Sequence, residues 1–160
     1  MTGMAWHHRM AGKLLRRVWR ITRPRTLGVR AILLDPDDRI ALVRHTYTDH
    51  WYLPGGGVKK GESTLAAIRR ELREEVAIDD ARFAALLGVY HATGEGKDDH
   101  VVIYVARTVT RRGDALEAAD TVEIAQARWF ALDALPDDLS PATKRRIAEY
   151  RGGGMTAERW

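Results

Sequence analysis

PGGGVKKGESTLAAIRRELREEVAI, residues 54–78, is the most informative stretch of this chain. Three successive glycines end at Gly57, and a stretch of helical character follows them. On a helix with about 3.6 residues per turn, Glu71, Glu74 and Glu75 stand at positions i, i+3 and i+4 of one face. Carboxylates that close repel one another, and a cation between them would offset the repulsion. Clustered carboxylate oxygens suit Mg²⁺ or Mn²⁺ rather than zinc.

The carboxylate cluster has two interpretations. One is a solvated acidic helix face, which is what most charge runs are. The other is a site for a metal ion and a phosphate, because glycines let the backbone approach a ligand closely and offer it N–H or C=O groups. The glycine loop directly before the helix favours the second interpretation.

The stretch resembles the Nudix box, whose pattern is Gly, five residues, Glu, seven residues, then Arg-Glu-apolar-x-Glu-Glu-x-Gly-apolar. Six of its seven fixed letters and both apolar positions match, at Gly56, Glu62, Arg70, Glu71, Leu72, Glu74, Glu75 and Ile78. The exception is Ala77, where the family has a glycine. A left-handed residue is often needed after a helix, so alanine there would cost about 1 kcal/mol if that conformation is kept.

The resemblance implies an α/β fold, namely a Nudix-type α/β/α sandwich with a mixed β-sheet and a loop-helix-loop catalytic motif. It also implies a hydrolase that depends on Mg²⁺ (or Mn²⁺). Such a pyrophosphohydrolase cleaves the diphosphate linkage of a nucleoside diphosphate joined to another moiety. Nucleotide sugars, ADP-ribose-like compounds and nucleoside triphosphates all contain this linkage, and no motif in the chain chooses among them.

The resemblance also assigns roles to residues of the box. The metal-binding and catalytic positions fall on Glu71, Glu74 and Glu75, with the Gly55 carbonyl as a backbone ligand. The structural or supporting positions fall on Gly56, Glu62 and Arg70. Glu123 is our candidate for a further metal ligand or catalytic base, because it lies six residues before Trp129, as in some members of the family. An exposed acidic loop residue is the alternative for Glu123.

Four basic side chains are candidates for contact with substrate phosphates: Arg44, His91, Lys97 and His100. Arg44 lies on the first predicted hairpin, and the other three bracket a polar loop. An ordinary surface position is the alternative for each of them.

The composition bounds the class of protein. A chain of 160 residues with 45% hydrophobic and 30% charged residues is typical of one globular domain. It contains no cysteine, which excludes disulfides, zinc–thiolate sites and thiol nucleophiles. No apolar run approaches about 18 residues, and no signal-peptide core follows the N-terminus. We therefore expect a cytoplasmic protein.

The net charge of +4 is unevenly distributed. The first 30 residues hold eight of the 26 basic residues and no acid, which leaves 18 basic and 22 acidic residues in the remainder. We divide the chain into a basic N-terminal arm (1–25), a Nudix hydrolase domain (26–150) and a flexible C-terminal tail (151–160). The acidic body offers no basic groove for RNA, so we expect a small-molecule nucleotide substrate and no nucleic-acid partner.

Residues 9–22 of the arm predict a basic amphipathic helix. Its apolar side has three interpretations. It packs on the domain or on a second subunit, which would make a homodimer. Alternatively, it makes peripheral contact with an anionic membrane surface, or it contacts a nucleotide or nucleic acid.

The remaining pattern predicts a sheet with few helices. Strands are expected over 26–34, 39–45, 51–53, 82–91, 100–109 and 127–132. Helices are expected after Ser63 or Thr64 as N-cap, and over 141–150 with Ser140 as N-cap. Polar connections are expected over 93–99 and 110–120, and a short helical turn over 133–135.

Two other functions compete with the enzyme. One is a non-catalytic nucleotide-sensing module, because a fold does not fix a function. The other is a membrane- or partner-associated protein whose basic helix is the main functional feature. The sensing module predicts loss of metal ligands, whereas all the box carboxylates are present.

Overall fold

The computed structural model describes residues 26–94, 97–110 and 113–160. Within them, segments with alternating apolar side chains form the strands of a six-stranded mixed sheet. The strand order is β3-β4-β1-β2-β6-β5, with β1 parallel to β4 and the other neighbouring pairs antiparallel. The strands are β1 (Leu27–Leu34), β2 (Arg39–His45), β3 (Arg82–Gly94), β4 (Lys97–Arg107), β5 (Ala115–Leu116) and β6 (Ile124–Ala131). The helix predicted over 9–22 lies outside the described residues.

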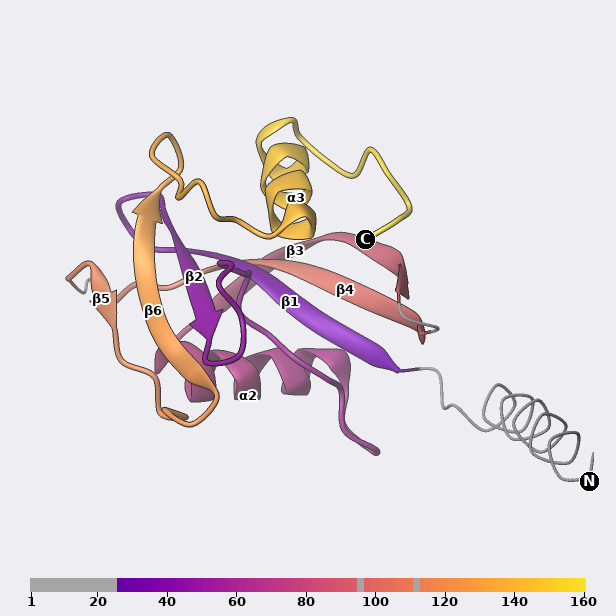
Figure 1. Ribbon diagram of the computed structural model, residues 1–160, viewed down its shortest axis with the longest axis horizontal. Coiled ribbons are helices and arrows are strands. Elements are labelled where there is room, and N and C mark those ends of the chain that lie inside the picture. The colour runs from indigo at the N-terminus through magenta and orange to yellow at the C-terminus, as the bar shows by residue number, and fades with distance from the viewer. Residues whose placement is uncertain (1–25, 95–96, 111–112) are drawn as a thin grey trace, which may run out of the picture.

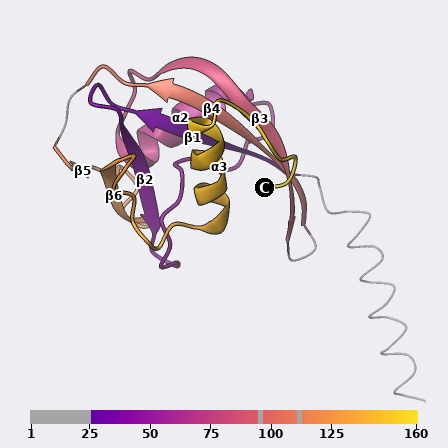
Figure 2. The same cartoon turned by 90° about the horizontal axis from the view of Figure 1, so that it is seen from above.

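One helix covers each face of the sheet. α2 (Thr64–Val76) lies against one face and α3 (Pro141–Arg151) against the other, as the two views in Figures 1 and 2 show. This arrangement confirms the expected α/β/α sandwich. Within the described part of the chain, neither helix is long and apolar enough to cross a membrane.

Each face of the sheet carries its own apolar cluster, because side chains alternate along a strand. On β1, Val29 and Leu33 belong to the cluster under α2, whereas Ile32 and Leu34 belong to the cluster under α3. The alternation of side chains predicted from the sequence therefore places residues of one strand in two buried layers, one on each face of the sheet.

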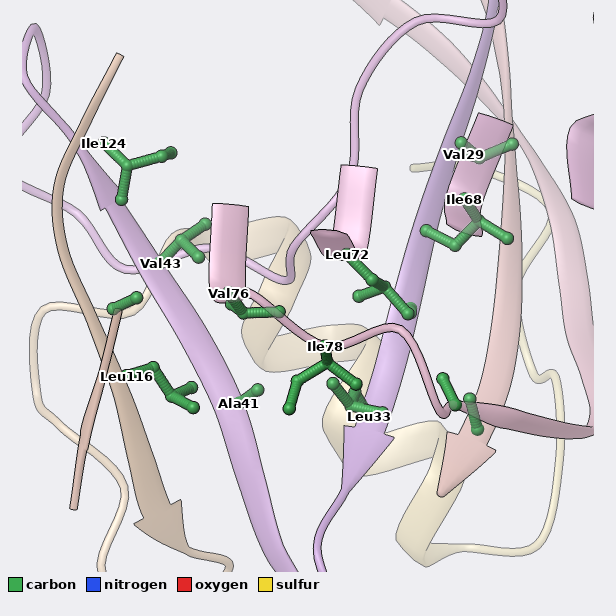
Figure 3. Packing of buried hydrophobic residues seen from close by; sticks show 14 of the residues in the cluster. Val29, Leu33, Ala41, Val43, Ile68, Leu72, Val76, Ile78, Leu116 and Ile124 are labelled. Atoms are coloured by element: carbon green, nitrogen blue, oxygen red, sulfur yellow. The ribbon is translucent and has the colours of Figure 1, made fainter. Parts of the chain in front are cut away.

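The apolar stripe of α2 packs on the first of these clusters. Ile68, Leu72 and Val76 are fully buried there, and Figure 3 shows them facing the strands. The i, i+3 spacing from Ile68 would place Leu65 in the same stripe, but Leu65 is 39% exposed. Ala67 is buried instead, so the stripe begins later along the helix than its spacing suggests.

The glycine loop lies between two strands that would otherwise pair. β1 and β2 are paired beside their turn and then diverge, and residues 51–58 run between them. Tyr52 exchanges backbone hydrogen bonds with β2 (2.8 and 3.0 Å), whereas the carbonyls of Pro54 and Gly56 accept hydrogen bonds from β1 (3.0 and 2.9 Å). The strand predicted over 51–53 is thus reduced to isolated bridges, and the sheet itself positions the loop.

The hairpin of β3 and β4 is longer than the sequence predicts. β3 reaches Gly94 and β4 begins at Lys97, so the predicted polar loop over 93–99 is mostly strand. This pair lies at the edge of the sheet, where backbone pairing continues without apolar side chains. Polarity was therefore a poor guide to where the ladder stops.

Two further differences lie near β6. The two-residue β5 falls within the connection predicted over 110–120, and it pairs with β6, which begins at Ile124. Residues 133–135 form a turn and bend rather than a helical turn. Strands this short carry too few residues to show a period in the sequence.

The segment after α3 returns to the edge of the sheet. The His91 N–H donates to the Glu158 carbonyl (2.8 Å), and the Trp160 N–H donates to the His91 carbonyl (2.9 Å). Figure 2 shows this segment running back toward β3. The sequence predicts a flexible tail over 151–160, and these bonds give its last residues a partner on β3.

The ends of the helices follow the capping signals. Ser63 caps α2, and its hydroxyl accepts from the Ala66 N–H (3.1 Å). Ser140 caps α3, with Pro141 in the first turn. Ala77 ends α2 in the left-handed conformation (φ 53°, ψ 37°), and its N–H donates to the Leu72 carbonyl. The alanine therefore keeps the conformation that favours glycine.

Replacing Ala77 with glycine should stabilise the protein by about 0.5–1 kcal/mol. Glycine relieves about 1–2 kcal/mol of left-handed strain and adds about 0.5–1 kcal/mol of backbone entropy cost. Thermal unfolding should show a Tm about 2–4 °C higher than that of the wild type.

Ala66→Gly is the matched control, because Ala66 is exposed within the same helix. This variant should lose up to about 1 kcal/mol, because glycine in a helix costs more backbone entropy than alanine. Equal destabilisation by both variants would contradict the strain at Ala77.

Candidate functional site

The glycine loop meets α2 at Gly55. Its φ is 140°, and a Cβ there would lie 2.1 Å from the Val29 carbonyl oxygen of β1, so no larger residue fits. The Gly55 N–H donates to Glu75 Oε2 at 2.6 Å. The close approach of loop to strand therefore places a backbone donor directly on a carboxylate of the helix.

Glu75 is a buried acid, with 4% of its surface exposed. Burial raises its pKa to about 8, and the charges of Glu71 and Glu123 act in the same direction. The positive charge of Arg30 and the Gly55 hydrogen bond oppose this rise without cancelling it. A bound cation would favour the ionised carboxylate, because opposite charge offsets the cost of burial.

Arg70 joins the loop to the other carboxylates. Its guanidinium donates to both oxygens of Glu62 (2.9 Å each), to Glu71 (2.6 Å) and to Glu74 (3.2 Å). It also donates to the carbonyl of Gly57 at 3.0 Å. The hydrogen bonds that Glu62 accepts from Arg70 and from the Lys59 N–H lower the pKa of Glu62 to about 2. The cation beside Glu71 and Glu74 is thus an arginine of the same helix.

Gly56 leaves room for Glu71. A Cβ at this position would lie 2.6 Å from Glu71 Oε1, which is closer than real contacts allow. The glycines at 55 and 56 therefore serve different purposes, since one accommodates the strand and the other accommodates a carboxylate.

A distant loop brings Glu123 to the same place. The N–H groups of Ala119 and Asp120 donate to the Glu74 carbonyl of α2 (2.9 and 3.0 Å). Asp120 Oδ1 then accepts from the Glu123 N–H (3.1 Å), and the Glu123 carbonyl accepts from Thr46 beyond β2 (2.9 Å). Backbone bonds to the helix and the sheet thus hold the half-exposed Glu123.

These parts surround one pocket of about 620 Å³. Its lining comes from the loop over 56–59 and from Arg70, Glu71, Glu74, Asp120 and Glu123. The pocket combines carboxylates with the cationic side chains of Lys59 and Arg70. Such a site suits an anionic ligand that arrives with a cation.

His45 and Asp120 also lie near this site, and neither was among the site residues predicted from the sequence. The His45 side chain is 6% exposed, and its Nδ1 lies 3.8 Å from Glu123 Oε1 without a hydrogen-bond partner. Burial and the charge of Arg30 lower its pKa, although Glu123 raises it. The spacing Asp120-x-x-Glu123, typical of a side chain that caps its own turn, was the available signal for Asp120.

The donor set fits a hard divalent cation, although it is not preassembled. Among the described residues, no three acidic or histidine side chains converge as a ready metal site. Arg70 contacts two of the carboxylates, and Glu75 is bonded to the loop. All donors are oxygens, as Mg²⁺ and Mn²⁺ prefer. Glu75, buried without a close cation, is the group that a metal ion would stabilise most.

Three of the four candidates for phosphate contact lie outside this pocket. Arg44 faces the α3 side of the sheet, where it pairs with Asp138 and stacks on Trp51 at 4.7 Å. His91 and His100 stack on each other across β3 and β4 (5.1 Å between ring centres). Neither Arg44 nor these histidines line the carboxylate pocket. Lys97 begins β4, and its side chain lies outside what the structure describes.

Comparison with known proteins identifies relatives along most of the chain. A family model described as the NUDIX domain matches residues 24–150. A protein of Bacillus subtilis (strain 168) with the provisional name 8-oxo-dGTP diphosphatase is 33% identical over 130 residues, which cover 81% of this chain and 83% of that protein. The ADP-ribose pyrophosphatase of Methanocaldococcus jannaschii is 28% identical over 109 residues, which cover 65% of this chain and 61% of that protein.

Comparison with solved structures finds the same family. The crystal structure of a MutT NUDIX hydrolase from Burkholderia pseudomallei superposes with a TM-score of 0.65 at 26% identity. The match covers 79% of this chain and 98% of that one.

Glu75→Gln should change how stability depends on pH in the metal-free protein. The folded wild type holds a proton on Glu75 up to about pH 8, whereas the unfolded chain releases it near pH 4.5. Stability from this proton is therefore lost as the pH rises from about 4.5 to 8. Urea unfolding with a chelator should show the variant more stable than the wild type at pH 8, by on the order of 1–4 kcal/mol.

The comparison at pH 5 is the control, because both side chains are then largely neutral in the folded state. If the difference in unfolding free energy between the two proteins were the same at both pH values, Glu75 would not have a raised pKa.

Proposed function

The chain belongs to the NUDIX hydrolase family, and on that premise we propose that it is a Mg²⁺-dependent pyrophosphohydrolase. Its substrate is a nucleoside diphosphate joined to another moiety, such as a nucleotide sugar, an ADP-ribose-like compound or a nucleoside triphosphate. The observation that carries the proposal is the buried Glu75, bonded to the Gly55 N–H beside Glu71 and Glu74. A buried acid with a raised pKa, next to a polar pocket lined by Glu71 and Glu74, is typical of functional sites.

Glu71, Glu74, Glu75 and the Gly55 carbonyl are the groups that would hold the metal. When bound, Mg²⁺ would neutralise charge on the diphosphate oxygens and lower the pKa of the attacking water. Mn²⁺ would serve the same donors. Glu62 and Arg70 support this set, because their bonds fix the glycine loop to the helix that carries the carboxylates.

The cationic groups of the pocket match an anionic diphosphate. Lys59 lies at the pocket surface, where its ammonium group would contact phosphate oxygens. Arg70 also lines the pocket, but its guanidinium is already bonded to carboxylates. Lys59 is therefore the side chain left to orient the substrate.

Glu123 is the residue that we propose as the base. In the proposed reaction, the oxygen of a water molecule attacks one phosphorus of the diphosphate, and the P–O bond to the bridging oxygen breaks. The water proton passes to the Glu123 carboxylate, and the bridging oxygen leaves with the second phosphate. Glu123 lines the same pocket as Glu71 and Glu74, and its loop is held from both sides.

Glu71→Gln and Glu75→Gln should each lower turnover by about a thousandfold or more, because each removes a charge that would hold the metal. The assay measures phosphate or nucleotide release from dGTP, ATP, ADP-ribose and UDP-glucose with Mg²⁺ or Mn²⁺. Chelator should abolish turnover in the wild type.

Glu117→Gln is the matched control, because Glu117 is an exposed acid outside the pocket. It should keep wild-type turnover. If the wild type hydrolysed none of the panel while nucleotides still raised its Tm, the non-catalytic sensing module would replace the enzyme.

Glu123→Gln tests the base separately. It should lower kcat by about a hundredfold to ten-thousandfold, with little change in the metal concentration required for half-maximal rate. A large rise in that metal concentration would instead make Glu123 a metal ligand. Unchanged kinetics would reduce it to an exposed loop residue.

A further inference from the structure

A second pocket adjoins the site at the glycine loop. It has a volume of about 440 Å³ and shares Gly56 and Gly57 with the carboxylate pocket. Its other walls include Arg30 of β1, Asp99 at the start of β4, and Trp160. The volume lies within the range of about 300–1,000 Å³ that is typical of small-molecule sites.

Trp160 lines this pocket, and its indole packs beside Tyr90 (6.3 Å between ring centres) on the apolar cluster under α3. Two bonds hold its backbone, since its N–H donates to the His91 carbonyl (2.9 Å) and its carbonyl accepts from Arg145 (2.6 Å). Arg146 of the same helix donates to the carbonyl of the preceding Arg159 (3.0 Å). The backbone that carries the indole is therefore anchored on both a strand and a helix.

A buried ion pair on α3 supports this segment. The Arg146 side chain is fully buried, and its guanidinium lies 3.8 Å from the centre of the Tyr90 ring. Glu149 pairs with Arg146 (3.1 Å) and accepts from the Tyr90 hydroxyl (2.8 Å). Glu149 also accepts from the N–H and hydroxyl of Thr156 (3.2 and 2.9 Å). A buried ion pair thus fixes the course of the segment that ends in the indole.

Arg30 connects the second pocket with the carboxylates. Its guanidinium donates to the Leu53 carbonyl (3.0 Å), which holds it beside the glycine loop. It lines the second pocket, and its charge also acts on Glu75. A ligand that spans the two pockets would therefore lie beside the positive charge of Arg30.

We propose that the nucleobase of the substrate stacks on Trp160 while the diphosphate lies along Gly56 and Gly57 beside the carboxylates. This inference rests on the proposed function and adds to it a residue that binds the nucleobase. Stacking suits any base, because every base has a π-face. Asp99, whose carboxylate accepts from the Thr26 hydroxyl, adds an acceptor for ring N–H or ribose hydroxyl donors.

The test compares a substrate with a ring to one without. In Trp160→Ala, the KM for the nucleotide that the wild type hydrolyses fastest should rise at least about tenfold, with kcat nearly unchanged. The KM for inorganic tripolyphosphate, which has the same linkage and no ring, should stay the same. Trp160→Phe should recover much of the lost affinity, which a role in packing alone would not predict for one substrate and not the other.

Met155→Ala is the matched control, because Met155 lies on the same segment, is exposed, and is absent from the pocket lining. It should leave both KM values unchanged. Equal effects of Trp160→Ala on both substrates, or no effect on either, would overturn the proposal.

The test remains decisive if the proposed hydrolysis is wrong. Where no substrate turns over, calorimetry with ADP-ribose and dGTP measures binding directly. Binding at least tenfold weaker in Trp160→Ala and unchanged in Met155→Ala would support the stacking platform. Equal binding in the wild type and Trp160→Ala, or no binding to the wild type, would overturn it.

Discussion

The insertion of the glycine loop between β1 and β2 is the constraint on which the rest of the site depends. Backbone groups of the loop bond to strands on both sides, and its buried Trp51 and Leu53 pack in the core, so its course is set from both directions. Gly55 lies against the backbone of β1, and its N–H then meets Glu75. Because α2 packs on the same sheet, the distance from loop to helix is fixed by the core.

The acids of this site are balanced in two different ways. Arg70 lies beside Glu71 and Glu74, so part of their mutual repulsion is relieved within the helix itself. Glu75 has a backbone N–H for a partner, and burial favours its neutral form although the charge of Arg30 opposes this. The fold therefore supplies one carboxylate whose charge is unfavourable until a cation arrives, which couples the stability of the site to its ligand.

The shared helix face of the box carboxylates and most of the sheet could be predicted from the sequence, because both depend on local spacing. Residues three and four apart share a helix face, and alternating residues share a strand face. The contacts of Glu123 could not be read in this way, since they depend on backbone bonds to the Glu74 carbonyl and to Thr46. Arg44 was a candidate on charge alone, although alternation from the buried Val43 places it on the opposite face. The position of Trp160 could not be predicted either, because it depends on backbone hydrogen bonds between the last residues and β3.

The return of the chain to β3 has a consequence for the protein in concentrated solution. β3 is an edge strand, and free N–H and C=O groups on such an edge invite pairing with other molecules. Leu86 and Val89 are large exposed apolar residues on this strand, which would strengthen any such association. The last residues occupy the N–H and C=O of His91 and so cover part of that edge. The segment predicted as a flexible tail thereby covers part of a strand edge that would otherwise be open to pairing with another molecule.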